Sequence, residues 1–253
     1  MIGFTEAQIL EWITPLLWPF LRALALFTAM PVLGGRSVPA RVRIALAGFI
    51  AFASQAALPP MPVVALDSPL AFVLVAQQVV IGLSLGFAVR VLVAVVEFAG
   101  ELVGLQMGLN FAGFFDPVTA SQGTVTARFL GTTITWMFIV INGHLMVIAA
   151  LVDSFTAFPV GPEPFAFVRS AQPHRWAAEI FATGLWIALP LVALLTFVNL
   201  VLGMISRVAP QINIFAVGFP VTLGVGLVGL LLMLPFLQAP FMVAMDRVLA
   251  GFR

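Results

Sequence analysis

Long stretches of this sequence contain no Asp, Glu, Lys or Arg. The uncharged runs are residues 44–66, 68–89, 129–152, 180–206 and 208–245. A helix needs about 20 consecutive apolar residues to cross the hydrocarbon core of a bilayer, and each run reaches that length. A further apolar stretch, 12–33, is interrupted only by Arg22. The pattern predicts an all-α protein that crosses a membrane several times.

Charged residues are too scarce for a protein whose whole surface faces water. They make up 8% of the chain, against 62% hydrophobic residues, whereas ordinary globular chains contain about 25% charged residues. The surface is therefore expected to face lipid or other apolar protein. The length of 253 residues suits one membrane unit.

Prolines divide the apolar stretches, because proline lacks the N–H that a helix needs and clashes with the preceding turn. Pro59, Pro60 and Pro62 are expected to end the second helix, which leaves 44–58 helical. Breaks are also expected at Pro15, Pro19, Pro31, Pro190, Pro220, Pro235 and Pro240. The last uncharged run is too long for one crossing, so a hairpin turn is expected at 207–213. The sequence thus predicts about six to eight broken or kinked helices.

Small residues recur at every fourth position of the segment 97–117. They are Gly100, Gly104, Gly108 and Ala112. On a helix this spacing forms one face with almost no side chains, and such faces pack closely against other helices in membranes. We therefore expect a helix-packing face here. Gly82 and Gly86 repeat the spacing once, which is a weaker signal.

Phenylalanines gather in the second half of the same segment. Phe111, Phe114 and Phe115 stand close to Asn110 and Asp116, and the glycine and proline that flank them favour a turn. Such side chains either form a hydrophobic constriction, as in some pores, or fill a gap in the core. The residues alone favour the core.

Charged residues within apolar stretches are functional candidates in membrane proteins. Here they include Arg22, Arg90, Glu97, Glu101 and Arg207. Glu97 and Glu101 share a helix face, so they repel unless a cation lies between them, and Arg90 lies near that face. A structural ion pair between helices is favoured over a proton relay. Arg207, at the expected hairpin turn, is expected to contact a partner.

Several chemistries lack the residues that they require. The chain has no Cys and no Lys, so it offers no disulfide, no thiolate ligand and no Walker lysine. Its two histidines lie far apart in the sequence, which disfavours a zinc site. A net charge of +1 disfavours nucleic-acid binding. We expect a protein that is not an enzyme and holds no metal or cofactor.

Four motifs, in order, resemble the FliR family of flagellar biosynthetic proteins. They are PVLGGRSVPARVRI at 31–44, GELVGLQMGLNFAGFFDP at 100–117, NGH at 142–144 with LVDSF at 151–155, and LVLGMISRVAPQINIFAVGFP at 200–220. Order and spacing match from residue 10 to 245. The injectisome export-gate subunit shares the family fold and is the alternative. The opening, residues 5–27, is more similar to the flagellar branch.

The resemblance implies a non-enzymatic subunit of the flagellar type III export gate, in the bacterial inner membrane and the flagellar basal body. Members of the family join FliP and FliQ in a helical, cone-like hetero-oligomer, and FlhB wraps around it. The assembly passes unfolded flagellar subunits across the membrane. The charged residues leave another alternative, a stand-alone proton-coupled transporter that uses Arg90, Glu97 and Glu101.

The resemblance also divides the chain. It implies a FliP-like helical part at 1–170 and a FliQ-like helical hairpin at 176–250, turning near 207–213. The family's plug loop corresponds to 106–122, which favours a plug over a core filler for the Phe cluster. The implied plug residues are Gln106, Met107, Gly108, Asn110, Phe111, Phe114, Phe115 and Asp116.

Overall fold

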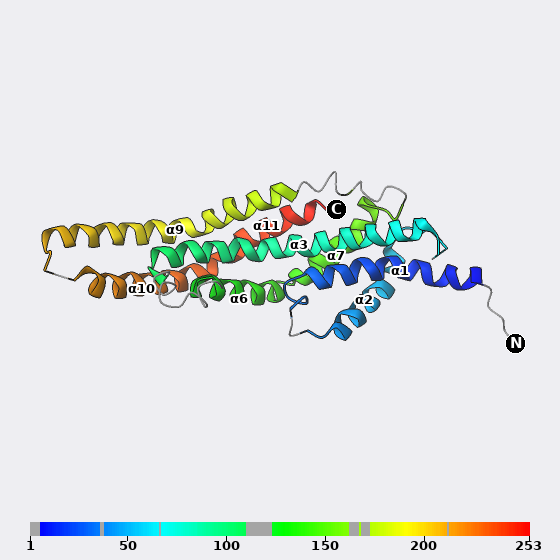
Figure 1. The fold of residues 1–253 in the computed structure, drawn as a ribbon, viewed down its shortest axis with the longest axis horizontal. Helices are drawn as coiled ribbons and strands as arrows, with labels where there is room; N and C mark the ends of the chain where they lie inside the picture. Colours follow the sequence, from blue (N-terminus) through cyan, green and yellow to red (C-terminus); the bar gives the residue numbers. More distant parts are fainter. Residues whose placement is uncertain are drawn as a thin grey trace. The chain divides into compact units, whose positions relative to one another are not determined.

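The computed structural model describes residues 6–35, 38–65, 67–109, 123–161, 167, 173–211 and 213–253. Every regular element in these residues is a helix, and they contain no β-strand (Figure 1). The predicted all-α fold is confirmed.

The helices are named here by the labels of Figure 1. They are α1 (Glu6–Ala29), α2 (Ala40–Ser54), α3 (Pro69–Gln106), α6 (Val125–Val140), α7 (Gly143–Ala157), α9 (Pro173–Val208), α10 (Ile214–Met233) and α11 (Gln238–Ala250). Short 3₁₀ helices at Gln55–Ala57 and Leu234–Leu237 directly follow α2 and α10.

Four of the described helical stretches are long and apolar enough to cross a membrane. They are Trp12–Ala29, Pro69–Gln106, Ala178–Val208 and Ala216–Ala250. The helices α6 and α7 meet at a bend of 69° and form a fifth candidate when they are taken as one broken span. The chain therefore has the helices of a multi-pass membrane protein, as the uncharged runs predict.

Helices α3 and α9 are longer than a membrane crossing requires. They contain 38 and 36 residues, which correspond to about 57 and 54 Å at 1.5 Å per residue. The hydrocarbon core is about 30 Å thick, and membrane helices tilt by up to about 40°. Each helix therefore extends well beyond the core at any usual tilt, and the apolar surface outside the core needs another cover.

Five of these prolines lie inside helices, and the predicted breaks there are wrong. Pro15 and Pro19 lie within α1, Pro190 within α9, Pro220 within α10 and Pro240 in the first turn of α11. A single proline removes one backbone hydrogen bond, and a long helix continues on both sides of it, often with a kink.

Other predicted breaks are confirmed. The second helix ends at Ser54, a few residues before Pro59, although it begins at Ala40, earlier than expected. The 3₁₀ helix that contains Pro235 separates α10 from α11. Several prolines together, or a proline beside a turn, therefore end a helix in this chain where an isolated proline does not.

Contacts divide the chain into two compact units. Unit 1 consists of Met1–Val91, Ile139–Trp176 and Met245–Arg253, and unit 2 consists of Leu92–Phe138 and Ala177–Ala244. The division at about residue 170 that the family resemblance implies stays a prediction.

In unit 2, α9 and α10 form a hairpin. Figure 1 shows them side by side, and α9 ends at Val208 while α10 begins at Ile214, within the range expected for the turn. A Cβ built on Gly229 of α10 would overlap the Leu191 side chain of α9. The two helices of the hairpin are therefore in direct contact at this glycine.

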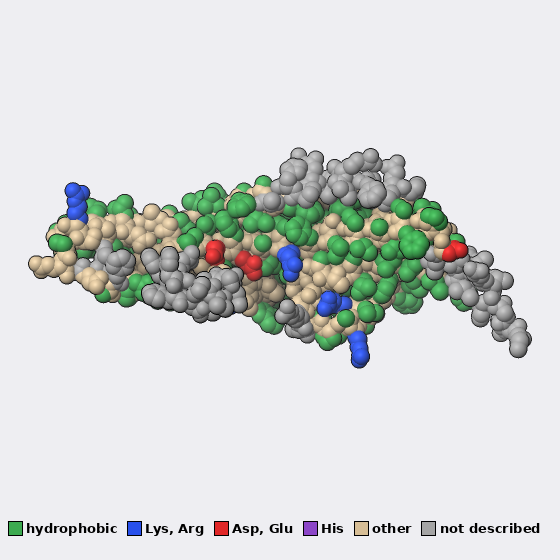
Figure 2. All heavy atoms as spheres, in the orientation of Figure 1, with side chains coloured by type: hydrophobic (Ala, Val, Ile, Leu, Met, Phe, Trp, Pro, Cys, Tyr) green, Lys and Arg blue, Asp and Glu red, His purple; other side chains and the backbone are tan. Residues whose placement is uncertain are grey.

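Apolar side chains dominate the surface. Figure 2 shows hydrophobic side chains spread over the visible face, with few charged side chains among them. In unit 2 the hairpin exposes large apolar side chains, including Trp186, Phe197, Met204 and Leu232. Such a surface on a single chain indicates that lipid or a protein neighbour normally covers it.

Candidate functional site

The end of α3 and the start of α6 lie on either side of the expected plug. The last residue of α3 is Gln106, and α6 begins at Val125. Gly108 has a φ angle of 78° and Gly123 has a φ angle of 80°. Residues with a side chain are strained at such angles, whereas glycine adopts them readily. A glycine therefore turns the chain at each side of the expected plug.

Glu101 of α3 holds the start of α6. Its Oε2 atom accepts a hydrogen bond from the backbone N–H of Thr124 over 3.0 Å and a second from the Thr124 hydroxyl over 2.8 Å. The Oγ1 atom of Thr124 accepts in turn from the N–H of Ala127 over 3.2 Å, as a helix N-cap does. One carboxylate on α3 thus fixes the N-cap residue of α6 with charge-assisted hydrogen bonds.

Gly100 and Gly104 allow α6 to approach the backbone of α3. The Thr126 hydroxyl donates to the carbonyl oxygen of Gly100 over 2.7 Å. A Cβ built on Gly100 would lie 2.7 Å from the Cα atom of Ala127, and one on Gly104 would overlap Thr126 Oγ1. Close helix packing therefore occurs at both glycines, and the neighbour is α6 of the same chain.

The other members of the expected packing face differ. Gly108 lies beyond Gln106, the last residue of α3, and its left-handed backbone does not continue the helix face. Ala112 lies outside the described residues. The spacing misleads at Gly108 because glycine is suited both to a packing face and to the end of a helix.

Helices α9 and α10 hold the last carbonyl groups of α3. The Thr222 hydroxyl on α10 shares its single proton between the carbonyl oxygen of Met107, at 3.4 Å, and that of Phe219 in its own helix, at 3.1 Å. The Asn199 amide on α9 donates to the carbonyl oxygen of Gln106 over 3.2 Å. The Met107 side chain is fully buried, and a Cβ built on Gly226 would lie 2.6 Å from its sulfur. The hairpin therefore caps the C-terminal end of α3 and fixes the chain where it leaves the helix.

Sequence reasoning missed three residues of this site: Thr124, Asn199 and Thr222. The signal for Asn199 and Thr222 is their polarity inside long apolar runs, where a polar side chain marks a contact with another helix; Thr222 is buried, whereas Asn199 is exposed on the isolated chain. The signal for Thr124 is its place directly before an apolar helix, where threonine is a common N-cap.

The expected plug residues divide at the end of α3. Gln106, Met107 and Gly108 are described, and they lie at the first end of the expected plug, where α9 and α10 contact the chain. The remaining expected plug residues, Asn110, Phe111, Phe114, Phe115 and Asp116, lie outside the described residues.

The five expected charged residues have different surroundings. Arg22 is completely buried, and Glu101 is half-buried against Thr124. Arg90, Glu97 and Arg207 are exposed on the isolated chain. Arg22 and Glu101 are therefore covered wholly or partly by the chain itself, whereas Arg90, Glu97 and Arg207 are covered only where a partner packs against them.

Arg22 lies in the core of unit 1. Its Nε atom donates to Oε1 of Gln78 over 2.8 Å and its Nη1 atom to Oγ of Ser154 over 2.9 Å. Its Nη2 atom donates to the carbonyl oxygen of Phe158 over 3.0 Å, and the guanidinium carbon lies 3.6 Å from the centroid of the Phe155 ring. These partners are neutral, so hydrogen bonds and a cation–π contact offset the lost hydration of the cation.

The hydrogen bonds of Arg22 continue into a network that joins α1, α3 and α7. Gln78 donates through Nε2 to Oε1 of Gln77 over 3.0 Å, and Gln77 donates to the carbonyl oxygen of Pro159 over 3.2 Å. A Cβ built on Gly82 would overlap the carbonyl oxygen of Arg22. The weaker glycine pair of the sequence thus contributes a direct contact between the backbones of α3 and α1.

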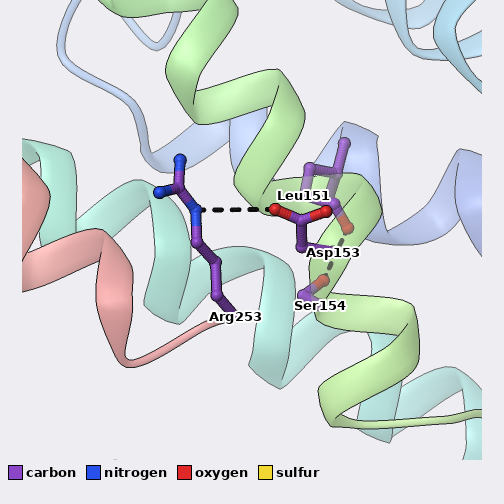
Figure 3. Close-up of polar contacts among 4 residues, drawn as sticks. All are labelled: Leu151, Asp153, Ser154 and Arg253. Atoms are coloured by element: carbon purple, nitrogen blue, oxygen red, sulfur yellow. Dashed lines mark hydrogen bonds and ion pairs between the residues drawn. The ribbon is translucent and has the colours of Figure 1, made fainter.

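The C-terminus of the chain contacts α7 next to this network. Figure 3 shows the Arg253 Nε atom paired with Oδ2 of Asp153 at 3.5 Å, beside Ser154, whose hydroxyl also donates to the carbonyl oxygen of Leu151 over 2.6 Å. Phe252 is fully buried. The Phe252 side chain is therefore part of the core of unit 1, whereas Gly251 and Arg253 on either side of it are exposed.

Comparison with known proteins identifies the family. The family described as bacterial export proteins, family 1, matches residues 13–248. The flagellar biosynthetic protein FliR of Escherichia coli (strain K12) is 42% identical over 241 residues, which cover 95% of this chain and 92% of that protein. The FliR protein of Aquifex aeolicus (strain VF5) is 30% identical over 227 residues, which cover 90% and 88%. The chain therefore belongs to the FliR family of bacterial export proteins.

Proposed function

We propose that this chain is a non-enzymatic channel subunit of the flagellar type III export gate. In this role it passes unfolded flagellar subunits across the bacterial inner membrane, within the flagellar basal body. Family membership supports a role in export, and the long apolar helices support a place in the membrane. The flagellar names of the relatives favour this gate over the injectisome gate.

The observation that carries the proposal is the anchoring at both ends of the segment 109–122. Met107 and Gln106 are held by Thr222 and Asn199 at one end, and Thr124 is held by Glu101 at the other. All of these contacts lie in unit 2. We propose that the segment between these anchors changes its conformation each time a substrate passes, while the helices on either side of it stay packed.

The apolar side chains of the Phe cluster are the part of the plug that closes the pore in this proposal. We propose that Phe111, Phe114 and Phe115 pack across the closed pore, together with the other residues of 106–122. Apolar side chains at a narrow point exclude water, and without water an ion loses its hydration shell. A plug of this kind blocks ions and yields to a polypeptide that pushes it aside.

Partners are proposed from the exposed apolar surface and the helix lengths. Apolar parts of α3 and α9 extend beyond any hydrocarbon core, so lipid alone does not cover them. We propose that FliP and FliQ cover them in a cone-like hetero-oligomer, with FlhB on the outside. In this assembly 1–170 is the FliP-like part and 176–250 is the FliQ-like hairpin.

The assembly claim is tested by isolating the tagged chain from membranes in a mild detergent and identifying its partners by mass. The proposal expects FliP and FliQ in fixed ratios with the chain. Recovery of the chain alone, or only as a homo-oligomer, contradicts it.

Reconstitution distinguishes the channel subunit from a stand-alone transporter. The purified chain alone in liposomes is expected to move no solute in response to a proton gradient. Proton-coupled uptake that Glu97→Gln or Glu101→Gln abolishes would support the transporter instead.

A further inference from the structure

An apolar groove runs between α1 and α2 of unit 1. Its volume is about 340 Å³, and all of its lining residues are apolar. Leu16 and Phe20 line it from α1, and Gly48 and Phe52 line it from α2. A Cβ built on Gly48 meets no atom within 4 Å. Glycine at this position therefore leaves the groove open, and no close packing of helices requires it.

The charges near the start of α2 are all positive. Between Glu11 and Asp67 the charged residues are Arg22, Arg36, Arg41 and Arg43, and the acidic residues of α1, Glu6 and Glu11, lie in its first two turns. Arg22 is buried, whereas Arg41 is exposed and Arg43 is partly exposed in the first turn of α2. That turn contains no acidic residue and no side-chain cap, so the helix dipole adds to the positive potential.

Arg43 has one buried donor without an acceptor within the described residues. Its Nη2 atom donates to the carbonyl oxygen of Val38 over 3.1 Å. Its Nε atom is buried and has no hydrogen-bond partner among them. A guanidinium with an unsatisfied donor next to a second arginine favours an anion with several acceptor oxygens.

The register of α2 places the charge and the groove on one face. Arg41 and Gly48 are seven residues apart and Gly48 and Phe52 are four apart, spacings that return to the same side of a helix. At 1.5 Å per residue, Arg41 and Phe52 are separated by about 16 Å along the axis. One leaflet of the hydrocarbon core is about 15 Å deep, half of the full thickness. Arg41 and the far end of the groove are thus spaced like the headgroup and the chain end of a phospholipid.

We infer that the groove binds an acyl chain of an anionic phospholipid whose phosphate lies against Arg41 and Arg43. An apolar helix of a protein neighbour fits the groove equally well but leaves the unneutralised arginines without an anion. The charge therefore favours the lipid. This inference does not depend on the channel or the plug.

Native mass spectrometry of the full-length chain tests the inference. The detergent-purified chain, freed of copurified lipid, is titrated with phosphatidylglycerol or with phosphatidylcholine of the same acyl chains. Phosphatidylglycerol is expected to bind more tightly. Arg41→Gln is expected to weaken it about fivefold, because one arginine near an anionic lipid surface contributes that much. Gly48→Leu, which fills the groove, is expected to weaken both lipids.

Matched controls separate the site from general lipid binding. Arg90→Gln removes another exposed arginine, and Gly203→Leu fills another open space on a helix. Both are expected to leave lipid affinity unchanged. Gly48→Leu introduces no Cβ clash, so its fold is expected to survive, and its thermal unfolding verifies this. Equal affinity for the two lipids, or equal losses in the controls and the site variants, overturns the inference.

Discussion

Glu101 and Thr124 are 23 residues apart, yet one carboxylate oxygen of Glu101 accepts both the backbone N–H and the hydroxyl of Thr124. The contact joins α3 to the N-cap of α6 and brings the two ends of the segment between them to one place. The proposed plug therefore has a base that is fixed by named hydrogen bonds.

Removing the Glu101 carboxylate is expected to loosen this base. Glu101→Ala loses two hydrogen bonds of a half-exposed carboxylate and should lower the free energy of unfolding by roughly 1–2 kcal/mol. It should also raise ion leakage of the assembled gate. Denaturant titration and a leakage assay measure the two effects.

The control for Glu101→Ala is Glu179→Ala. At 1.5 Å per residue Glu179 lies about 30 Å along α9 from Asn199, the residue of α9 that contacts Gln106, and it accepts a hydrogen bond from Thr183, one turn further along α9. The control should leave leakage unchanged. Similar leakage in both variants would show that Glu101 does not fix the plug.

Gly104→Ala is expected to disturb the packing of α6 on α3. The added Cβ overlaps Thr126 Oγ1 and lies 2.9 Å from Thr124 Oγ1, so α6 has to move. Overpacking of this kind costs about 1–3 kcal/mol. Gly203→Ala is the control, because its Cβ meets nothing within 4 Å and alanine favours a helix by about 1 kcal/mol over glycine. In thermal unfolding measured in detergent, the midpoint temperature should fall for Gly104→Ala and should not fall for Gly203→Ala.

Arg22 is expected to be the most sensitive charged residue. Arg22→Ala leaves the buried acceptors on Gln78, Ser154 and Phe158 unpaired and creates a cavity, at a cost of about 3–5 kcal/mol. Arg22→Lys keeps the charge but lacks the planar donor fork, so it should fall between alanine and the wild type. Arg90→Ala, at an exposed position, should change stability by less than about 0.5 kcal/mol. Equal unfolding midpoints for Arg22→Ala and Arg90→Ala would contradict the role of the network.

Arg207→Ala is expected to reduce assembly and spare conductance. Arg207 is exposed in the last turn of α9, at the end of the hairpin, where a partner contact is proposed. The yield of complex copurified with FliP and FliQ should fall, while the conductance of each assembled complex stays the same. An unchanged yield argues against a contact at this residue.

The fold could be predicted because its main signals are local. Each uncharged run is long enough to specify a helix, and the clustered prolines near Pro59 mark the end of α2. Isolated prolines such as Pro190 do not mark an end, because the loss of one hydrogen bond is small beside the packing of a 36-residue helix.

The hydrogen-bond partners of the charged side chains could not be predicted as well as the helices. Gly100 and Gly104 were identifiable because steric contact depends on spacing along one helix. The partners of Arg22 lie 56, 132 and 136 residues away, and no local pattern selects them. From the charges in the sequence we expected a cation near Glu101. In the structure its carboxylate instead accepts hydrogen bonds from the backbone N–H and the hydroxyl of Thr124.

The conductance of the purified gate complex in a planar bilayer tests the central claim most directly. A variant that replaces Phe111, Phe114 and Phe115 together by serine is compared with the wild type and with a control that replaces Phe49 and Phe72, both exposed in unit 1. The account predicts a closed wild type, a closed control and a triple variant that conducts ions. An intact complex of the triple variant that stays as closed as the wild type would contradict a plug formed by these residues.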